Sequence, residues 1–139
     1  MSNSLFIDTS GWASIIVLTE QHHVIATQHF RQAILTQQSI LTSNYIITEL
    51  VALLQSPLRL PRSAIFAQVD IIRNNALVQQ IHLTSELDQA AWELCKQRLD
   101  KTWSLVDCSS FILMQQLKIQ TALTTDHHFE QVGFTRLLK

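Results

Sequence analysis

Short apolar runs alternate with longer stretches of helical periodicity along this chain. The short runs are bounded by polar residues, which is typical of buried strands, and they lie at residues 5–7, 39–42, 76–81, 121–124 and 135–138. Apolar residues recur every three or four positions between them, which predicts helices over residues 10–18, 22–37, 44–54, 61–72, 84–95 and 104–117. Strands that alternate with helices favour an α/β fold, with a parallel sheet covered on both faces.

Residues that cap helices support several of these boundaries. Ser10, Thr84 and Ser104 each precede an apolar helical stretch, and their hydroxyls suit an N-cap. Asp107 stands three residues after Ser104, which makes a near capping box. No repeat, linker or low-complexity tract interrupts the chain, so we expect all 139 residues to form one domain.

The composition limits the classes of function. Of the residues, 47% are apolar and 15% are charged, and the net charge of −1 offers no basic field for nucleic acid. The two glycines, Gly11 and Gly133, exclude a P-loop or a dinucleotide-binding fingerprint, because each needs several glycines. Cys95 and Cys108 lie far apart without Cys-x-x-Cys spacing, so we expect neither a zinc site nor a redox pair. We interpret both as core or subsurface thiols.

Neither a leader nor a membrane segment is expected from the sequence. The first four residues carry no lysine or arginine, unlike the start of a signal peptide. No apolar run reaches the ~20 residues that cross a bilayer. We therefore expect a soluble cytoplasmic protein.

Four acidic residues are predicted to lie at the same edge of the sheet. Asp8 ends the first strand, and Asp126 follows the fourth. Glu49 lies early in the helix after the second strand, and Asp107 lies in the first turn of the helix before the fourth. Because ligands of an open α/β sheet bind beyond the carboxyl ends of its strands, we expect these side chains to converge there.

Each acid also has a purely structural interpretation. Asp8 and Asp126 suit turn or cap positions, Asp107 suits a capping box with Ser104, and Glu49 suits a solvated helix face. The sequence around the four acids, however, contains no lysine or arginine, so converging carboxylates would repel one another without a divalent cation. Oxygen ligands favour Mg²⁺ or Mn²⁺ over zinc. The pattern favours metal-dependent phosphoryl transfer or phosphodiester hydrolysis.

Four segments carry motifs whose order and spacing match one family. They are FIDTS at 6–10, NYIITE at 44–49, WSLVDCSSF at 103–111 and LTTDHHF at 123–129. With these segments the chain resembles the PIN-domain ribonucleases, and more narrowly the VapC-type toxins of bacterial toxin–antitoxin pairs. The resemblance implies a three-layer α/β/α sandwich around a parallel five-stranded sheet. It also implies Mg²⁺ or Mn²⁺ as cofactor, an RNA substrate, a homodimer and a VapB-like antitoxin as inhibitory partner.

The resemblance assigns the metal-site and catalytic positions to four acids, Asp8, Glu49, Asp107 and Asp126. It assigns supporting roles to the hydroxyls of Ser10 and Ser104. The chain departs from the family pattern at Thr102, where close relatives often carry another acid, and at His127, where many carry Arg, Lys or Asp. These departures concern substrate affinity and leave the predicted metal site complete.

The hypothesised mechanism divides the work among the four acids. Asp8 and Asp107 are expected to be the principal ligands of one ion. Asp126 and Glu49 are expected to complete that site or to hold a second ion. The ion would activate a water for in-line attack on a backbone phosphate, with Glu49 to orient or deprotonate it. The products would carry a 5′-phosphate and a 3′-hydroxyl.

Two further sets of residues are candidates for contacts outside the acids. Arg59, Arg62 and Arg73 are the best phosphate-binding candidates, although a solvated helix face explains them equally well. An apolar set could form a groove for an antitoxin or a dimer partner, or it could be plain core. Its members are Trp12, Ile15, Ile16 and Leu18, with residues 50–54.

Two rival functions fit parts of the pattern. A dehalogenase-type phosphoryl enzyme would explain Asp8 after an apolar strand, but it wants a second Asp where Ser10 stands, and a later Lys. A catalytically silent PIN-like RNA-binding or scaffold domain is the other alternative. It is disfavoured because all four acids are present.

Overall fold

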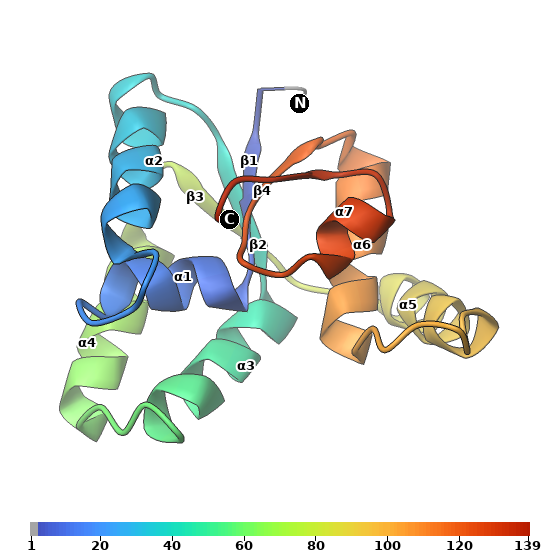
Figure 1. Ribbon diagram of the computed structural model, residues 1–139, viewed down its shortest axis with the longest axis horizontal. Coiled ribbons are helices and arrows are strands. Elements are labelled where there is room, and N and C mark those ends of the chain that lie inside the picture. Colours follow the sequence, from blue (N-terminus) through green and yellow to red (C-terminus); the bar gives the residue numbers. More distant parts are fainter. Residues whose placement is uncertain (1–2) are drawn as a thin grey trace.

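Five parallel strands form one sheet in the order β3-β2-β1-β4-β5 (Figure 1). The computed structural model describes residues 3–139, so Met1 and Ser2, which begin the segment expected not to be a signal peptide, lie outside the described residues. The strands are β1 (Leu5–Ile7), β2 (Ile40–Ser43), β3 (Val78–Ile81), β4 (Thr121–Leu123) and β5 (Thr135–Arg136). All five strands predicted from the sequence are confirmed, with β5 at an edge.

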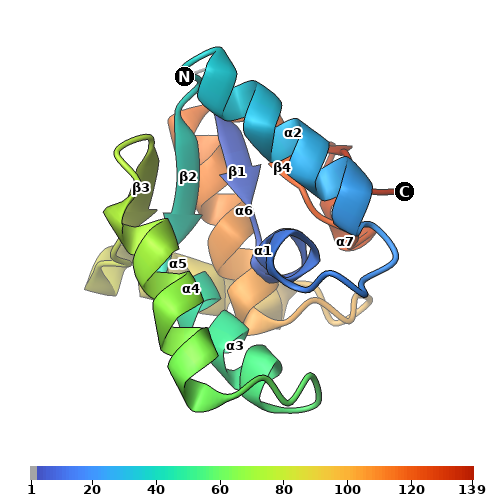
Figure 2. The same ribbon diagram turned by 90° about the vertical axis from the view of Figure 1, so that its left-hand side faces the viewer.

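Helices cover both faces of this sheet. They are α1 (Thr9–Ile16), α2 (His23–Leu35), α3 (Asn44–Gln55), α4 (Arg62–Asn74), α5 (Ser85–Gln97), α6 (Leu105–Leu117) and α7 (His128–Gln131). The first, second and fourth helices lie on one side of the strands, and α5, α6 and α7 lie on the other (Figure 1). Figure 2 shows the same layering from the side of α2 and α4, with α6 behind the sheet. The predicted three-layer α/β/α sandwich is confirmed.

The central strands are buried because helices cover them on both faces. Every residue of β1 and β2 is buried, which explains why β1 is a continuous apolar run and why β2 begins with two apolar residues rather than alternating with exposed polar ones. On the far side of the sheet, Phe111 of α6 contacts Phe129 of α7 edge-on, with ring centroids 5.0 Å apart. Such a buried aromatic pair adds to the burial of apolar surface. It holds α7 against α6. Asp126, just before α7, and Asp107, in the first turn of α6, are thereby kept near each other.

The first helix begins and ends earlier than its periodicity predicts. Asp8, and not Ser10, is the N-cap, because Asp8 Oδ1 accepts a hydrogen bond of 3.0 Å from the backbone N–H of Gly11. A Cβ at Gly11 would lie 2.1 Å from the carbonyl oxygen of Leu123, so only glycine lets α1 start this close to β4. The helix ends at Ile16, which leaves Leu18 outside it and 78% exposed.

Two predicted caps are confirmed. Thr84 is the N-cap of α5. Ser104 and Asp107 form a full capping box at the start of α6: Ser104 Oγ accepts from the Asp107 backbone at 3.0 Å, and Asp107 Oδ2 accepts from the Ser104 backbone at 3.0 Å. The box places the Asp107 carboxylate at the N-terminus of α6, where the helix dipole favours negative charge.

The two cysteines, which are far apart in the sequence, lie together in the structure. Cys95 in α5 and Cys108 in α6 are free, and their sulfurs are 2.9 Å apart. They meet because the two helices pack side by side, which no local spacing motif reports. Burial and the neighbouring Cys95 raise the pKa of the Cys108 thiol to about 12, so this thiol stays protonated at neutral pH.

Most of the apolar set considered as a partner groove belongs to the core. Trp12, Leu50 and Leu54 are fully buried, while Ile15 and Ile16 pack partly buried against them. Of that set, Leu18 is exposed. The other exposed large apolar side chains lie elsewhere: Val24, Ile25, Leu35, Phe66, Ile71, Trp92 and Leu99. Among residues 3–139, no helix combines the length and the apolar character needed to cross a membrane.

Candidate active site

Asp8 lies at the centre of the acidic edge and is nearly removed from solvent, with 8% of its surface exposed. It follows the last residue of β1 directly and caps α1. Besides the Gly11 amide, its Oδ1 accepts from the Ser10 hydroxyl at 2.9 Å. Its Oδ2 accepts from the Thr124 hydroxyl at 2.7 Å. These three donors hold the carboxylate in one orientation.

Burial changes the protonation of Asp8 even though its donors favour the charged form. Desolvation raises the pKa of this carboxyl to about 7, against the lowering effect of the hydrogen bonds from Thr124, Gly11 and Ser10. The nearby charge of Asp126 raises it further. A buried carboxylate with a neighbouring carboxylate and no cation is therefore half protonated near neutral pH.

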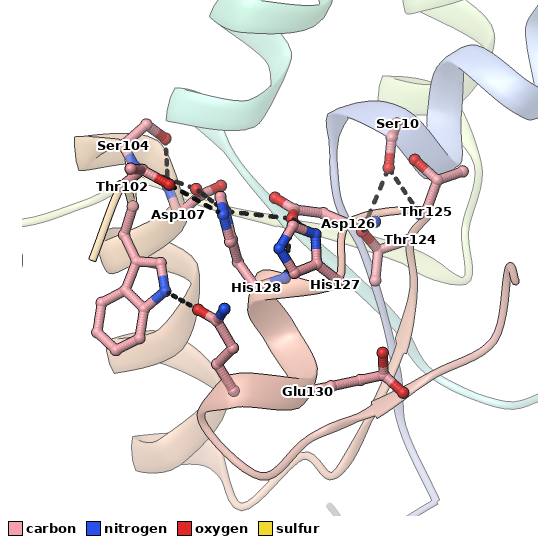
Figure 3. A network of polar contacts seen from close by, with 12 residues as sticks. Ser10, Thr102, Ser104, Asp107, Thr124, Thr125, Asp126, His127, His128 and Glu130 are labelled. Atoms are coloured by element: carbon pink, nitrogen blue, oxygen red, sulfur yellow. Dashed lines mark hydrogen bonds and ion pairs between the residues drawn. The ribbon is translucent and has the colours of Figure 1, made fainter. Parts of the chain in front are cut away.

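Asp126 is tied to Asp8 through the turn that follows β4. The Thr124 hydroxyl that donates to Asp8 also accepts from the backbone N–H of Asp126 at 2.9 Å. The backbone N–H of Thr125 donates to the Ser10 hydroxyl at 2.9 Å. Figure 3 shows Ser10 facing this turn, with Asp126 projecting from it. Ser10 thus contacts Asp8 and holds the two segments together, and it does not cap α1.

His128 lies between Asp107 and Asp126. Its Nδ1 is 3.3 Å from Asp107 Oδ2 and 3.2 Å from Asp126 Oδ1, and its Nε2 is 3.3 Å from the Thr102 hydroxyl (Figure 3). The imidazole and the Asp107 side chain are each 18% exposed. Burial raises the pKa of Asp107, and the charge of Asp126 adds to this, while the Ser104 backbone and His128 lower it.

Glu49 belongs to α3 and contacts the residue that follows Asp8. It lies in the second turn of α3, where its Oε1 accepts a hydrogen bond of 2.5 Å from the hydroxyl of Thr9. Thr9 is the residue after Asp8, so this bond attaches α3 to the first turn of α1. The structure thus joins Asp8, Asp107 and Asp126 by charge and hydrogen bonds, and it attaches Glu49 to them through Thr9.

The sequence model of the PIN-domain family matches residues 5–135 of this chain. The chain belongs to the PIN-domain family. This PIN domain is 29% identical over 133 residues to the 23S rRNA-specific endonuclease VapC20 from two strains of Mycobacterium tuberculosis, CDC 1551/Oshkosh and ATCC 25618/H37Rv. The match covers 96% of this chain and 97% of the relative. The resemblance on which the family was predicted is confirmed.

A solved structure supports the same relationship. The PIN domain superposes on the crystal structure of Mycobacterium tuberculosis VapC20, described as a sarcin–ricin loop cleaving toxin, with a TM-score of 0.82 and 28% identity. The superposition covers 95% of this chain and 97% of VapC20. The chain is therefore a homologue of a VapC toxin, and the dehalogenase-type alternative is wrong.

The donor set of this PIN domain fits a divalent cation. Within residues 3–139, no lysine or arginine forms an ion pair with any of the four acids. Histidines pair with two of them, and ligand atoms of Asp126, His127 and His128 lie within 4.8 Å of one another. Carboxylate oxygens suit Mg²⁺ and Mn²⁺, and an imidazole nitrogen suits Mn²⁺ better than Mg²⁺.

The sequence analysis missed His128 and Thr124 as members of this PIN-domain site. Both stand inside the LTTDHHF segment, in which only Asp126 and His127 were singled out. A histidine two residues after a strand-end acid is a signal that was available, since histidine is a common partner of metals and carboxylates. The role of Thr124 had no such signal, because it depends on the pairing of β1 with β4.

The three candidate arginines lie in α4 or in the loop before it. Arg59 lies in the loop before α4, Arg62 begins the helix, and Arg73 lies in its last turn. The two helical arginines are about 16 Å apart at the rise of an α-helix. All three are exposed, and the Arg62 guanidinium lies 5.0 Å from the ring centre of Phe66. They do not form one compact patch, and their contact with phosphate stays a prediction.

Proposed function

We propose that this protein is a Mg²⁺- or Mn²⁺-dependent endoribonuclease and the toxin of a VapBC-type pair. The observation that carries the proposal is the buried Asp8 carboxylate, which is exposed to the charge of Asp126 and forms no ion pair with a lysine or arginine of residues 3–139. Such a charge needs a cation. The similarity to the endonuclease VapC20 over nearly the whole chain supports RNA cleavage rather than a silent scaffold.

We assign distinct tasks to the four acids around the cation. Asp8 and Asp107 are its principal ligands, and Asp126 completes the site. When bound, the ion supplies a Lewis acid that activates water and neutralises charge on the phosphate oxygens. Glu49, held by Thr9, is left to orient the attacking water and accept its proton.

Four polar residues keep these acids in place. Ser10 and Thr124 fix the Asp8 carboxylate, and Ser104 fixes that of Asp107. His128 contacts both Asp107 and Asp126 and sets the spacing between them. Because these bonds exist before substrate arrives, little reorganisation is needed when the reaction begins.

The family relationship also suggests the partners. We propose an RNA substrate, a VapB-like antitoxin that inhibits the enzyme, and a homodimer built from single-domain chains. The relative's target makes the sarcin–ricin loop of 23S rRNA the first substrate to test. A ribosomal substrate also implies action in the cytoplasm. Arg59, Arg62 and Arg73 are proposed as secondary phosphate contacts, whose removal would flatten the salt dependence of RNA affinity.

Cleavage of a sarcin–ricin loop RNA by the purified protein tests the proposal. We expect cuts with Mg²⁺ or Mn²⁺ that leave a 5′-phosphate, none with EDTA, and a loss of at least about 1,000-fold in Asp8→Asn. Asp70→Asn, which alters an exposed acid of α4, is the matched control and should cut normally. Wild-type cleavage in EDTA, or full activity of Asp8→Asn, would contradict the metal mechanism. Binding without cleavage would favour the silent scaffold.

The same pair of variants can be tested in cells. Expression in a bacterial host, followed by mapping of new RNA 5′-ends, should give one dominant site with the wild type and none with Asp8→Asn. A dominant site outside 23S rRNA would retain the nuclease assignment and change its target.

A further inference from the structure

An open hollow lies directly beside the acidic site, between α3 and the first turn of α6. Its volume is about 460 Å³, within the range of about 300–1,000 Å³ that small-molecule sites occupy. Six residues line it: Asn44, Tyr45, Thr48, Glu49, Ala52 and Val106. We call it the α3–α6 hollow.

Two of its lining residues connect the hollow to the proposed reaction centre. Glu49 belongs to both, since its Oε1 accepts from Thr9 next to Asp8. Val106 immediately precedes Asp107 in α6. A group bound in the hollow is therefore next to Glu49 and to the residue before Asp107. Glu49 and Asp107 are two of the acids that are proposed to act on the scissile phosphate.

The walls of the hollow are held in place by bonds to neighbouring elements. The Tyr45 hydroxyl donates to Asp88 of α5. Asn44 Oδ1 accepts from the backbone N–H of Leu83 at 2.8 Å. Both residues are half-buried and anchored away from the acids, so the hollow keeps its shape without a ligand.

The chemistry of the lining selects one kind of occupant. A phosphate is disfavoured, because the lining contains no cation and includes the carboxylate of Glu49. An aromatic ring, two aliphatic side chains and an amide instead suit a flat, neutral heteroaromatic group. In RNA that group is the nucleobase.

We propose that the α3–α6 hollow binds one unpaired nucleobase of the RNA, next to the phosphate that is cleaved. This inference rests on the proposed ribonuclease function. A base in a duplex cannot enter the hollow, so the enzyme requires single-stranded or looped RNA around the cut. Target choice then depends on which base fits against Tyr45 and Val106.

The test combines removal of the base with filling of the hollow. A series of sarcin–ricin loop RNAs carries one abasic nucleotide each, at successive positions around the cut. Ala52→Trp fills the hollow from the exposed face of α3, and Ala90→Trp makes the same change in a separate hollow on α5. Cleavage of every RNA by the wild type and both variants is measured as kcat/KM.

The expected result is a penalty at one position that disappears when the hollow is filled. Loss of that base should lower wild-type kcat/KM by about 10- to 100-fold. In Ala52→Trp the intact RNA should lose a similar factor, and the same abasic nucleotide should then cost less than about threefold. Ala90→Trp should behave like the wild type. Equal cleavage of all abasic RNAs by the wild type, or an unchanged penalty in Ala52→Trp, overturns the proposal.

A second measurement separates this inference from the nuclease itself. RNAs with one 2-aminopurine at each position are bound to the proteins in EDTA, where no cleavage occurs. One position should change its fluorescence with the wild type and Ala90→Trp but not with Ala52→Trp. If the wild type cuts no RNA, the nuclease proposal fails, and this fluorescence alone decides the base site. Thr48→Trp, also on the exposed face of α3, replaces Ala52→Trp if circular dichroism shows that variant unfolded.

Discussion

The two sides of the acidic site differ in how tightly they are built. On the β1–β4 side, Asp8 receives three hydrogen bonds and Asp126 is tied to it through Thr124. On the α3 side, Glu49 has one hydrogen bond, to Thr9, and borders the open α3–α6 hollow. The first side fixes charge before any ligand arrives, while the second leaves space. A nuclease needs both, because positioned charge stabilises the reaction and space admits the RNA.

The register of the sheet explains why the first side is so well ordered. Ile7 of β1 pairs with Leu123 of β4. The next residues, Asp8 and Thr124, therefore leave the sheet side by side, and the hydrogen bond between them follows from strand pairing. Glu49 is carried instead by a helix, more than one turn beyond the end of β2. Its position depends on how α3 packs and is less constrained.

The largest expected effect concerns the cost of burying Asp8. Without a divalent cation, its raised pKa of about 7 means that the charged form destabilises the fold. This penalty is absent below the ordinary value of 3.8, grows as pH rises, and is complete above about 7. Asp8→Asn should therefore be more stable than the wild type at pH 8 in EDTA, by up to about 4 kcal/mol.

Urea unfolding of both proteins between pH 4 and pH 8 measures this difference. It should shrink toward zero at the acidic end, and saturating Mn²⁺ should reverse it at pH 8, because only the wild type gains a full ligand set. Asp70→Asn serves as the exposed control, with no pH-dependent gain. A difference that stays constant across the pH range would show that Asp8 is not the titrating group.

The second prediction addresses the open side of the site. Glu49→Gln keeps an oxygen that can accept from Thr9 but removes the base, so kcat should fall about 100-fold. Stability should change little, since the residue is only partly buried. Single-turnover cleavage and thermal unfolding measure the two quantities. A large loss of stability with unchanged kcat would make Glu49 a structural residue of α3.

Thr124→Val tests the bond that orders the β1–β4 side. The substitution keeps the shape of the side chain but removes the donor to Asp8 and the acceptor for the Asp126 backbone. Activity should fall about 10- to 100-fold, as for other residues that orient metal ligands. Stability should fall by about 1–3 kcal/mol, because buried polar groups lose partners. Thr36→Val, at the end of α2, gives the control.

The smallest predicted effect separates two neighbouring histidines. His128 contacts both Asp107 and Asp126, whereas His127 is 65% exposed and lies 3.9 Å from Asp126 alone. His128→Ala should weaken Mn²⁺ binding about 10-fold, and His127→Ala should have less effect. Isothermal titration calorimetry measures both. Equal losses would mean that the imidazole between the acids has no special role.

Much of the fold and of the acidic motif was predictable from local sequence. Short apolar runs predicted the strands, because strands covered on both faces bury most of their residues. The Ser104–Asp107 spacing predicted the capping box, whose bonds span only three residues. The four acids were found because parallel strands bring their carboxyl ends to one edge.

Contacts between distant segments were not predictable in the same way. The N-cap role of Asp8, the Thr124 bond and the Cys95–Cys108 contact all depend on which elements lie side by side. The phosphate-binding candidates illustrate the converse, since Arg62 and Arg73 are near in sequence but lie at opposite ends of α4.

The sequence by itself determined three things: the order of strands and helices along the chain, the family, and which acids stand at the ends of strands. Only the tertiary structure decided that Asp8 is desolvated, that His128 lies between Asp107 and Asp126, and that a hollow opens beside Glu49. The physical reason is range. Periodicity and caps act within a few residues, whereas desolvation, coupled charge and empty space arise only where strand register and helix packing bring distant side chains together.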